Sequence, residues 1–482
     1  MRNWNKTQWL YLFAGLFIAI ACVGIALEHF EVLLIPVVLL IVYLAFFHLD
    51  TLYLFLLFLV PLSVNLDDIG MGVGMTLPTD PILFGLLLLV IIKSLYLESF
   101  NTNILKHPVS IIIYIQLAWV FISSLTSTMP VISFKYLTAQ LWYFATFYFI
   151  ATHVFLKIRN IKKFFWLYVL PFSIVITYTL VRHASFNFDQ HPGNWVMKPF
   201  YNDHTSYGAA LALFIPFLIG ITFNYNKKEA LFKPLYFFIL LYFIVATIFS
   251  YTRAAWLSLA VGLMVYIILK FKIRWQILFV GFISLCIAGL VMQNEIEHYF
   301  SKNKVNSSTE IDQHVKSMSN VSSDASNKER INRWKSGFEM FKERPIFGWG
   351  PGTYSFNYGK FQKASDKTII STNAGDGGNA HSEFVGPMSE SGILGILIVF
   401  VFFITILITA VRVYKRSTTQ FFKNYSIFCV IGLVTYMIHG FLNNFLDTDK
   451  ITAPFYGMTA IIVVMDLYQK NKITLQEDDL NA

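Results

Sequence analysis

Long runs of hydrophobic residues recur along the chain, and short polar segments separate most of them. The runs are about 17 to 22 residues long, close to the ~20 residues that a helix needs to cross a bilayer. The pattern predicts an all-α polytopic membrane protein with about 12–14 transmembrane helices. Fourteen spans are expected near residues 9–27, 32–49, 52–66, 82–97, 109–128, 135–155, 164–181, 207–224, 234–251, 253–271, 275–292, 393–411, 425–445 and 452–468.

One long polar stretch interrupts this alternation and divides the chain into regions. We expect an N-terminal transmembrane bundle of about eleven spans at 1–292, then a large extracytoplasmic loop at 293–391. Three C-terminal transmembrane helices follow at 392–470, and a short tail at 471–482 ends the chain on the cytoplasmic side.

The distribution of Lys and Arg between the short loops predicts the orientation, because cytoplasmic loops retain these residues. With the N-terminus inside, twenty of them fall in cytoplasmic segments and five in short outer loops. Both termini are therefore expected on the cytoplasmic side of the membrane. The cytoplasmic set is Arg2, Lys6, Lys93, Lys106, Lys157, Arg159, Lys162, Lys163, Lys227, Lys228, Lys233, Lys270, Lys272, Arg274, Arg412, Lys415, Arg416, Lys423, Lys470 and Lys472, and the outer set is Lys135, Arg182, Lys198, Arg253 and Lys450.

Composition agrees with this class, since 56% of residues are hydrophobic and 13% are charged, against about 25% charged in soluble proteins. The net charge of +9 follows from the loop asymmetry and a basic outer loop, so it does not indicate nucleic acid as a partner. Cys22, Cys286 and Cys429 all lie in apolar runs. They predict neither a disulfide framework nor a thiolate metal site.

The amino-acid composition of the large loop changes along its length. Its first third, 301–329, is rich in Ser, Asn and Lys and is expected to be mobile. Residues 329–341 place apolar side chains at helical spacing and predict an amphipathic helix. The glycines of 345–356 predict a tight turn, and 364–380 is a second flexible segment that leads to His381.

The residues after this segment carry an ordered motif. His381 and Ser382 are followed by nine residues and then by Gly392 and Gly395, with Glu390 just before the first glycine. Upstream lie Arg330 and Trp334, the turn Pro345-Ile-Phe-Gly-Trp-Gly-Pro-Gly352, and Arg253 in Thr-Arg-Ala-Ala-Trp256 at the start of a span. In this order and spacing, the C-terminal half of the chain resembles the O-antigen ligase and O-antigen polymerase superfamily.

The resemblance implies a metal-independent, inverting glycosyltransferase that uses an undecaprenyl-pyrophosphate-linked glycan as donor and a lipid or glycan as acceptor. It implies catalytic roles for His381 and Arg253, with Ser382, Glu390 and Gly392 in support. No cofactor and no metal are expected. The partners are these two substrates and membrane lipids, and nucleic acid is not among them.

Elementary chemistry indicates roles for the same residues in binding the donor and in activating the acceptor. A pyrophosphate donor needs cations that hold it and stabilise the leaving diphosphate, and arginine offers a planar fork that is always charged. Arg182, Arg253 and Arg330 are the candidates for this site. The acceptor hydroxyl needs a base, and histidine titrates in the right range.

Structural interpretations stand beside the functional ones. His381 is alternatively a loop histidine that caps the next helix, and Arg253 an interfacial anchor whose head reaches the lipid headgroups. Arg330 is alternatively part of the solvated face of a surface helix. Glu390 is alternatively an acid that favours a helix N-terminus. His439 lies in an apolar run, where a structural hydrogen bond and a functional partner are equally compatible.

The predicted function is that of an O-antigen ligase, which transfers the glycan to lipid A-core or a similar acceptor at the outer face of the membrane. The first alternative is the polymerase of the same superfamily, whose acceptor is another lipid-linked repeat unit. A further alternative is a flippase for lipid-linked oligosaccharides, although the paired half-repeats typical of transporters are not evident. A non-catalytic scaffold would not explain the ordered Arg, Arg and His set.

Overall fold

The computed structural model describes residues 5–67, 70, 74–96, 101–223, 231–274, 276–277, 284, 325–368, 371 and 378–475. These residues are almost entirely helical, which confirms the predicted all-α class. Nine of the described helices are long and apolar enough to cross a membrane, and two shorter apolar helices accompany them. The described part of the chain therefore has the architecture of a polytopic membrane protein.

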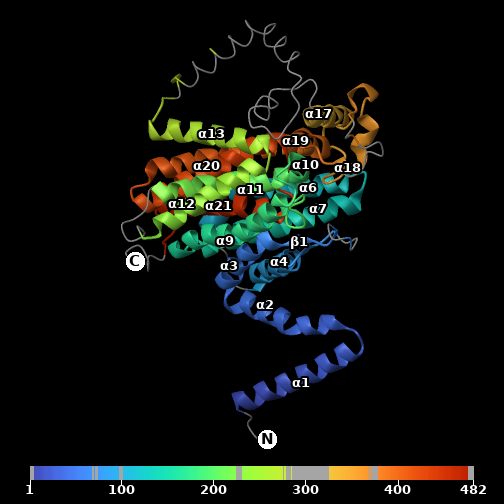
Figure 1. The fold of residues 1–482 in the computed structure, drawn as a ribbon, viewed down its shortest axis with the longest axis vertical. Coiled ribbons are helices and arrows are strands. Elements are labelled where there is room, and N and C mark those ends of the chain that lie inside the picture. The colour runs from blue at the N-terminus through green and yellow to red at the C-terminus, as the bar shows by residue number, and fades with distance from the viewer. Residues whose placement is uncertain are drawn as a thin grey trace. The chain divides into compact units, whose positions relative to one another are not determined.

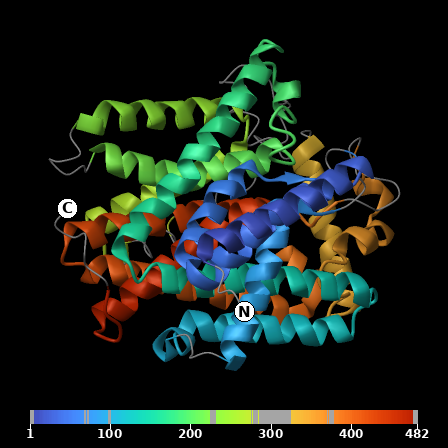
Figure 2. The ribbon, with the colours of Figure 1, turned by 90° about the horizontal axis from the view of Figure 1, so that it is seen from below.

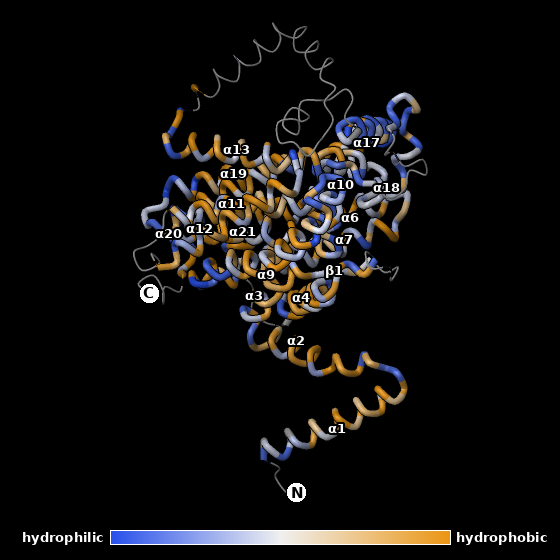
Figure 3. Tube along the Cα trace, viewed as in Figure 1, coloured by the Kyte–Doolittle hydropathy of each residue, from blue (hydrophilic) through white to orange (hydrophobic). Residues whose placement is uncertain are grey.

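The chain divides into two compact units, Met1–Tyr53 and Leu54–Ala482. The first unit contains helix α1 (Lys6–Ala26), a 3-10 helix (Phe30–Leu34) and helix α2 (Ile35–Phe47). Its helices expose many apolar side chains, as expected for helices whose solvent is lipid. Most of their length is coloured as hydrophobic in Figure 3. Helix α3 (Leu49–Leu59) runs across the boundary between the units.

The second unit is the helical bundle of Figure 1. It also holds one antiparallel hairpin, in which Val64 pairs with Leu77. The elements of the first half are a 3-10 helix (Val60–Leu62), β1 (Val64–Asn65), β2 (Thr76–Leu77), α4 (Thr79–Tyr96), α5 (Thr102–Leu105), α6 (Pro108–Leu125), α7 (Pro130–Tyr143), a π-helix (Phe144–Ile150), α8 (Ala151–Val154), α9 (Ile158–Ala184), α10 (Gln190–Gly193), α11 (His204–Phe223), α12 (Lys233–Phe249) and α13 (Arg253–Lys270).

After the residues outside the described range come the helices that build the site. They are α17 (Ala325–Glu343), α18 (Tyr354–Asn357), two 3-10 helices (Tyr358–Phe361 and Ala364–Asp366), α19 (Val385–Arg416), α20 (Gln420–Leu442) and α21 (Asp449–Gln469). Helices α11, α20 and α21 are buried along most of their length. Other apolar helices, among them α6 and α13, leave many apolar side chains exposed. Figure 2 shows the same ribbon from below.

The expected spans overlap described helices, except for 275–292, which falls largely outside the described residues. The same holds for the segment at 301–329, of which only the end is described, and for part of 364–380. The amphipathic helix expected at 329–341 is present as α17, a largely hydrophilic helix in Figure 3. Orientation and the exact span count stay predictions.

Candidate functional site

Helix α19 breaks at Gly392, and this break receives the glycine-rich turn of the preceding loop. Gly392 has φ 69°, and a Cβ atom there would lie 2.0 Å from the carbonyl oxygen of Ile346. The amide of Ile393 donates to the carbonyl of Pro345 at 2.9 Å, and that of Gly350 donates to the carbonyl of Glu390 at 2.8 Å. Only glycine combines this φ with so close a backbone approach. The two motifs of the sequence therefore form one structural unit.

Glu390 holds this unit together through its side chain as well. Its carboxylate accepts a hydrogen bond from the amide of Tyr354 at 2.8 Å, at the start of α18. The indole nitrogen of Trp119, on α6, donates to the carbonyl of Ser391 at 2.8 Å. Glu390 thus caps a neighbouring helix rather than its own.

Ser382 and Glu383 fix the start of α19. The hydroxyl of Ser382 accepts from the amides of Phe384 at 3.2 Å and Val385 at 3.4 Å, so its visible role is that of a helix cap. The carboxylate of Glu383 accepts from the amide of Phe445 at 2.8 Å and from the hydroxyl of Tyr436. Glu383 therefore ties the segment to the end of α20.

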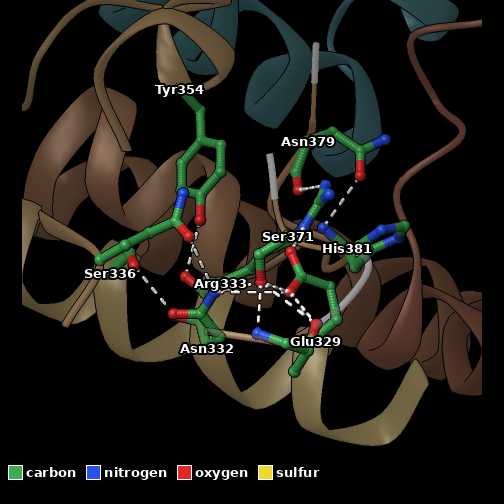
Figure 4. A network of polar contacts seen from close by, with 10 residues as sticks. Glu329, Asn332, Arg333, Ser336, Tyr354, Ser371, Asn379 and His381 are labelled. Atoms are coloured by element: carbon green, nitrogen blue, oxygen red, sulfur yellow. Dashed lines mark hydrogen bonds and ion pairs between the residues drawn. The ribbon is translucent and has the colours of Figure 1, made fainter. Parts of the chain in front are cut away.

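His381 lies between these anchors, in a backbone conformation that its neighbours enforce. It has φ 48°, in the left-handed region. Its amide donates to the side-chain oxygen of Asn379 at 3.1 Å, and its carbonyl accepts from the indole of Trp334 at 3.4 Å. Arg333 donates to the carbonyl of Asn379 at 2.9 Å (Figure 4). Helix α17 thereby positions the histidine.

Arg333 is in turn held by a buried acid on the same helix. Its guanidinium bonds the carboxylate of Glu329 at 2.9 Å, and Glu329 also accepts from the hydroxyls of Thr368 and Ser371 (Figure 4). Burial raises the pKa of Glu329, but these hydrogen bonds and the Arg333 charge lower it by a larger amount. The pKa of Glu329 is therefore below its usual value. The anchor of the His381 segment is therefore an ionised pair.

The imidazole of His381 is half-buried, and its Nδ1 atom is buried without a hydrogen-bond partner among the described residues. Burial, followed by the charges of Arg333 and Arg330, lowers its pKa from 6.5 to about 3, against the opposing charge of Asp203. Both causes penalise the protonated form. His381 is consequently neutral throughout the physiological pH range.

Further polar side chains converge on His381 from helices far apart in sequence. Arg330 donates to the carbonyl of Leu442 at 3.3 Å, at the end of α20. His439, one turn earlier, is buried and lies within electrostatic range of both Arg330 and Asp203. Burial raises the pKa of Asp203, but the nearby His204 charge and local hydrogen bonds lower it more, so it falls below its usual value. Two arginines, Arg333 and Arg330, and two carboxylates, Asp203 and Glu329, thus lie around the imidazole.

Arg253 begins α13 at the same end of the bundle. The hydroxyl of Thr252 donates to the carbonyl of His204 at 2.7 Å, which places Arg253 beside the start of α11 and Asp203. A Cβ atom on Gly208 would lie 2.6 Å from Thr252, so the two helices pack closely here. Arg253 therefore begins its helix beside Asp203, whose charge also acts on His381.

Arg182 belongs to a neighbouring loop and is already engaged. Its guanidinium donates to the carbonyl of Lys198 at 2.7 Å and to the hydroxyl of Tyr178 at 3.1 Å. It also stacks over the ring of Trp195, 5.0 Å from the centroid. A diphosphate bound by Arg182 would share the guanidinium with these groups.

Two cavities are lined by residues next to His381 in the sequence. The first, here called the acidic cavity, has a volume of about 270 Å³ and is lined by three carboxylates, Glu383, Glu390 and Asp447. The second has a volume of about 350 Å³. They share Asn379, Asn444 and Asp447 in their walls. Burial and the Glu383 charge raise the pKa of Asp447 to about 7.

Sequence reasoning missed Asp203, Glu383 and Asp447. Each is a single acid near the end of an apolar run, where a capping role is the default interpretation. These acids could have been singled out because acidic residues are scarce in such a chain, and an acid near the membrane often marks a functional site. Among the described residues, no three His, Cys, Asp or Glu side chains gather as they do in a metal site.

Residues 235–400 match the family model described as O-antigen ligase. No curated protein matches the chain significantly. The matched region contains Arg253, Arg330, His381 and Gly392. This region of the chain is therefore similar to the O-antigen ligase family.

Proposed function

We propose that this chain is a ligase-type enzyme that moves a glycan from undecaprenyl pyrophosphate to a sugar hydroxyl of lipid A-core or a similar acceptor. The reaction takes place at the outer face of the bacterial inner membrane. The observation that carries the proposal is the neutral imidazole of His381, with an unpartnered nitrogen, beside a cluster of arginines. Such a pairing suits proton abstraction next to an anionic leaving group.

In the proposed step the acceptor hydroxyl oxygen attacks the anomeric carbon from the face opposite the diphosphate. The bond between that carbon and the diphosphate oxygen breaks, and its electron pair leaves with the diphosphate. The hydroxyl proton passes to His381. A single displacement of this kind inverts the anomeric configuration and needs no metal, because arginines supply the positive charge.

Arg253 and Arg330 are the proposed diphosphate ligands, with Arg182 at the edge of the site. Arginine can bind phosphate oxygens in bidentate fashion and remains charged at any relevant pH. A bound diphosphate also offsets the positive charges that depress the pKa of His381. Donor binding therefore makes the histidine a stronger base at the moment when it is needed.

The intermediate that accumulates in a strain lacking this chain tests the proposal. Full-length polymer that remains on the lipid carrier at the outer face indicates a ligase. Single lipid-linked repeat units there indicate the polymerase alternative, and lipid-linked glycan retained on the cytoplasmic face indicates a flippase. Wild-type chain should clear the intermediate on re-expression, whereas Arg253→Ala at the same abundance should not.

A further inference from the structure

The acidic cavity contains buried polar groups that the protein itself leaves unused. Gln140 and Tyr456 line it and are only 3% and 1% exposed. Neither side chain forms a hydrogen bond within the described part of the chain. Gln116 also lines the cavity, and its side-chain oxygen is buried without a described partner. Buried polar groups are normally satisfied, so these point to a ligand or water.

The lining combines three kinds of side chain that suit a carbohydrate. Amides and carboxylates accept and donate hydrogen bonds to hydroxyls, and tyrosine rings cover the apolar face of a sugar. Tyr136, Tyr354 and Tyr456 supply the rings, and Asn379 and Asn444 supply further amides. The acidic cavity of about 270 Å³ has the dimensions of a small ligand site rather than of a lipid chain.

The charge of the cavity separates it from the diphosphate site. Glu383, Glu390 and Asp447 line it, and no Lys or Arg occurs among its described lining residues. Arg333 and Arg330 instead donate to the carbonyls of Asn379 and Leu442, and neither arginine lines the cavity. A diphosphate is repelled by the first environment and attracted by the second.

We propose that the acidic cavity binds a sugar ring of the acceptor and selects a ring that is neutral or carries an amine. This inference rests on the proposed function only in naming the ring as the acceptor's. Asn379 lines the acidic cavity two residues before His381, so a ring held there places a hydroxyl near the proposed base. Above neutral pH, where the carboxylates are ionised, a uronic or phosphorylated ring is rejected, because its negative charge meets theirs.

Saturation-transfer NMR on the full chain in lipid nanodiscs tests this without requiring turnover. The probes are lactose, a glucosamine disaccharide and a disaccharide that contains glucuronic acid. We expect saturation of the first two and at least about tenfold weaker binding of the third. Gln140→Leu and the milder Tyr456→Phe should weaken lactose binding about tenfold. Asp447→Asn should admit the anionic probe.

The controls separate this inference from the proposed reaction. Thr452→Val removes a buried hydroxyl that lies outside the cavity and should leave lactose binding unchanged. Arg253→Ala should bind lactose normally although it loses transfer. Equal saturation by anionic and neutral probes, or lactose binding that survives Gln140→Leu and Tyr456→Phe alike, would overturn the inference even if the chain proves to be a ligase.

Discussion

Two histidines of the second unit, His107 and His381, show how a buried imidazole is used in different ways. The Nε2 atom of His107 lies 3.2 Å from the buried carboxylate of Asp466, and its Nδ1 atom accepts from the amide of Val109 at 3.2 Å. Both ring nitrogens of His107 are therefore occupied. The Nδ1 atom of His381 is also buried, but it has no described partner. A satisfied imidazole stabilises the fold, whereas an unsatisfied one marks a site.

The two rings also differ in the group that the neighbouring positive charges face. Asp466 next to His107 also contacts Lys470 and Arg412, so positive groups gather on a carboxylate. Around His381 the positive groups face the imidazole itself, which makes its protonation unfavourable. The first arrangement is a neutralised structural network. The second keeps the imidazole neutral.

The largest effect is expected at Arg253. Arg253→Ala should lower the transfer rate about 10²- to 10³-fold, the usual cost of removing one donor that stabilises developing charge. Arg253→Lys should recover only part, because an ammonium lacks the bidentate geometry. Transfer from a lipid-linked donor in proteoliposomes measures both. Wild-type activity of the alanine variant would show that Arg253 is only an interfacial anchor.

At His107 the effect should fall on stability instead. His107→Ala removes one partner of the buried Asp466 and should cost about 1–3 kcal/mol. The melting temperature of the purified protein should drop, while the activity per folded molecule should stay at the wild-type level. Lost catalysis in a stable His107→Ala protein would break the contrast between the two histidines.

A smaller effect is expected at Ser382, next to the proposed base. Ser382→Ala removes a cap at the start of α19, which typically costs about 1 kcal/mol. Transfer should be mildly reduced, since the position of His381 depends chiefly on Asn379 and Trp334. If this variant were as inactive as Arg253→Ala, Ser382 would have to be given a chemical role.

The smallest change is expected in the pH profile. His381 has a pKa of about 3 in the free protein, so it stays neutral and kcat/KM for the donor should not fall between pH 8 and about pH 5. Arg330, Arg333 and Glu329 on α17 and Asp203 before α11 are the charges that set this value. In the donor complex the diphosphate raises the pKa, so kcat should begin to fall at a higher pH than kcat/KM. A decline of kcat/KM centred near 6.5 would contradict the described environment.

Much of the fold could be predicted from the sequence, because long apolar runs give a strong signal. The helices α6, α9, α11 and α20 lie where spans were expected. The sequence did not predict that the break in α19 packs against the glycine-rich turn. It depends on Gly392 meeting the backbone of Ile346, and a pairing between such distant residues leaves no periodic trace in the chain.

The site was predictable only where a motif has fixed spacing. His381, Glu390 and Gly392 could be found in this way, and the structure joins them to the preceding turn. Asp203 and Asp447 could not, because tertiary packing alone brings them to His381 and to the cavities. Arg182 shows the converse, since its charge suggested a ligand but its guanidinium also fastens its own loop.

The most direct test of the central claim compares transfer and flipping by His381→Ala in proteoliposomes with a lipid-linked donor. Loss of a positioned base should slow transfer about 10²- to 10⁴-fold. The melting temperature should stay near that of the wild type, because the side chain of His381 has no described partner at Nδ1 to lose. Movement of the lipid-linked glycan across the bilayer should be unchanged. Transfer at the wild-type rate by His381→Ala would contradict the assignment of His381 as the base, and a variant defective in flipping would favour a transporter.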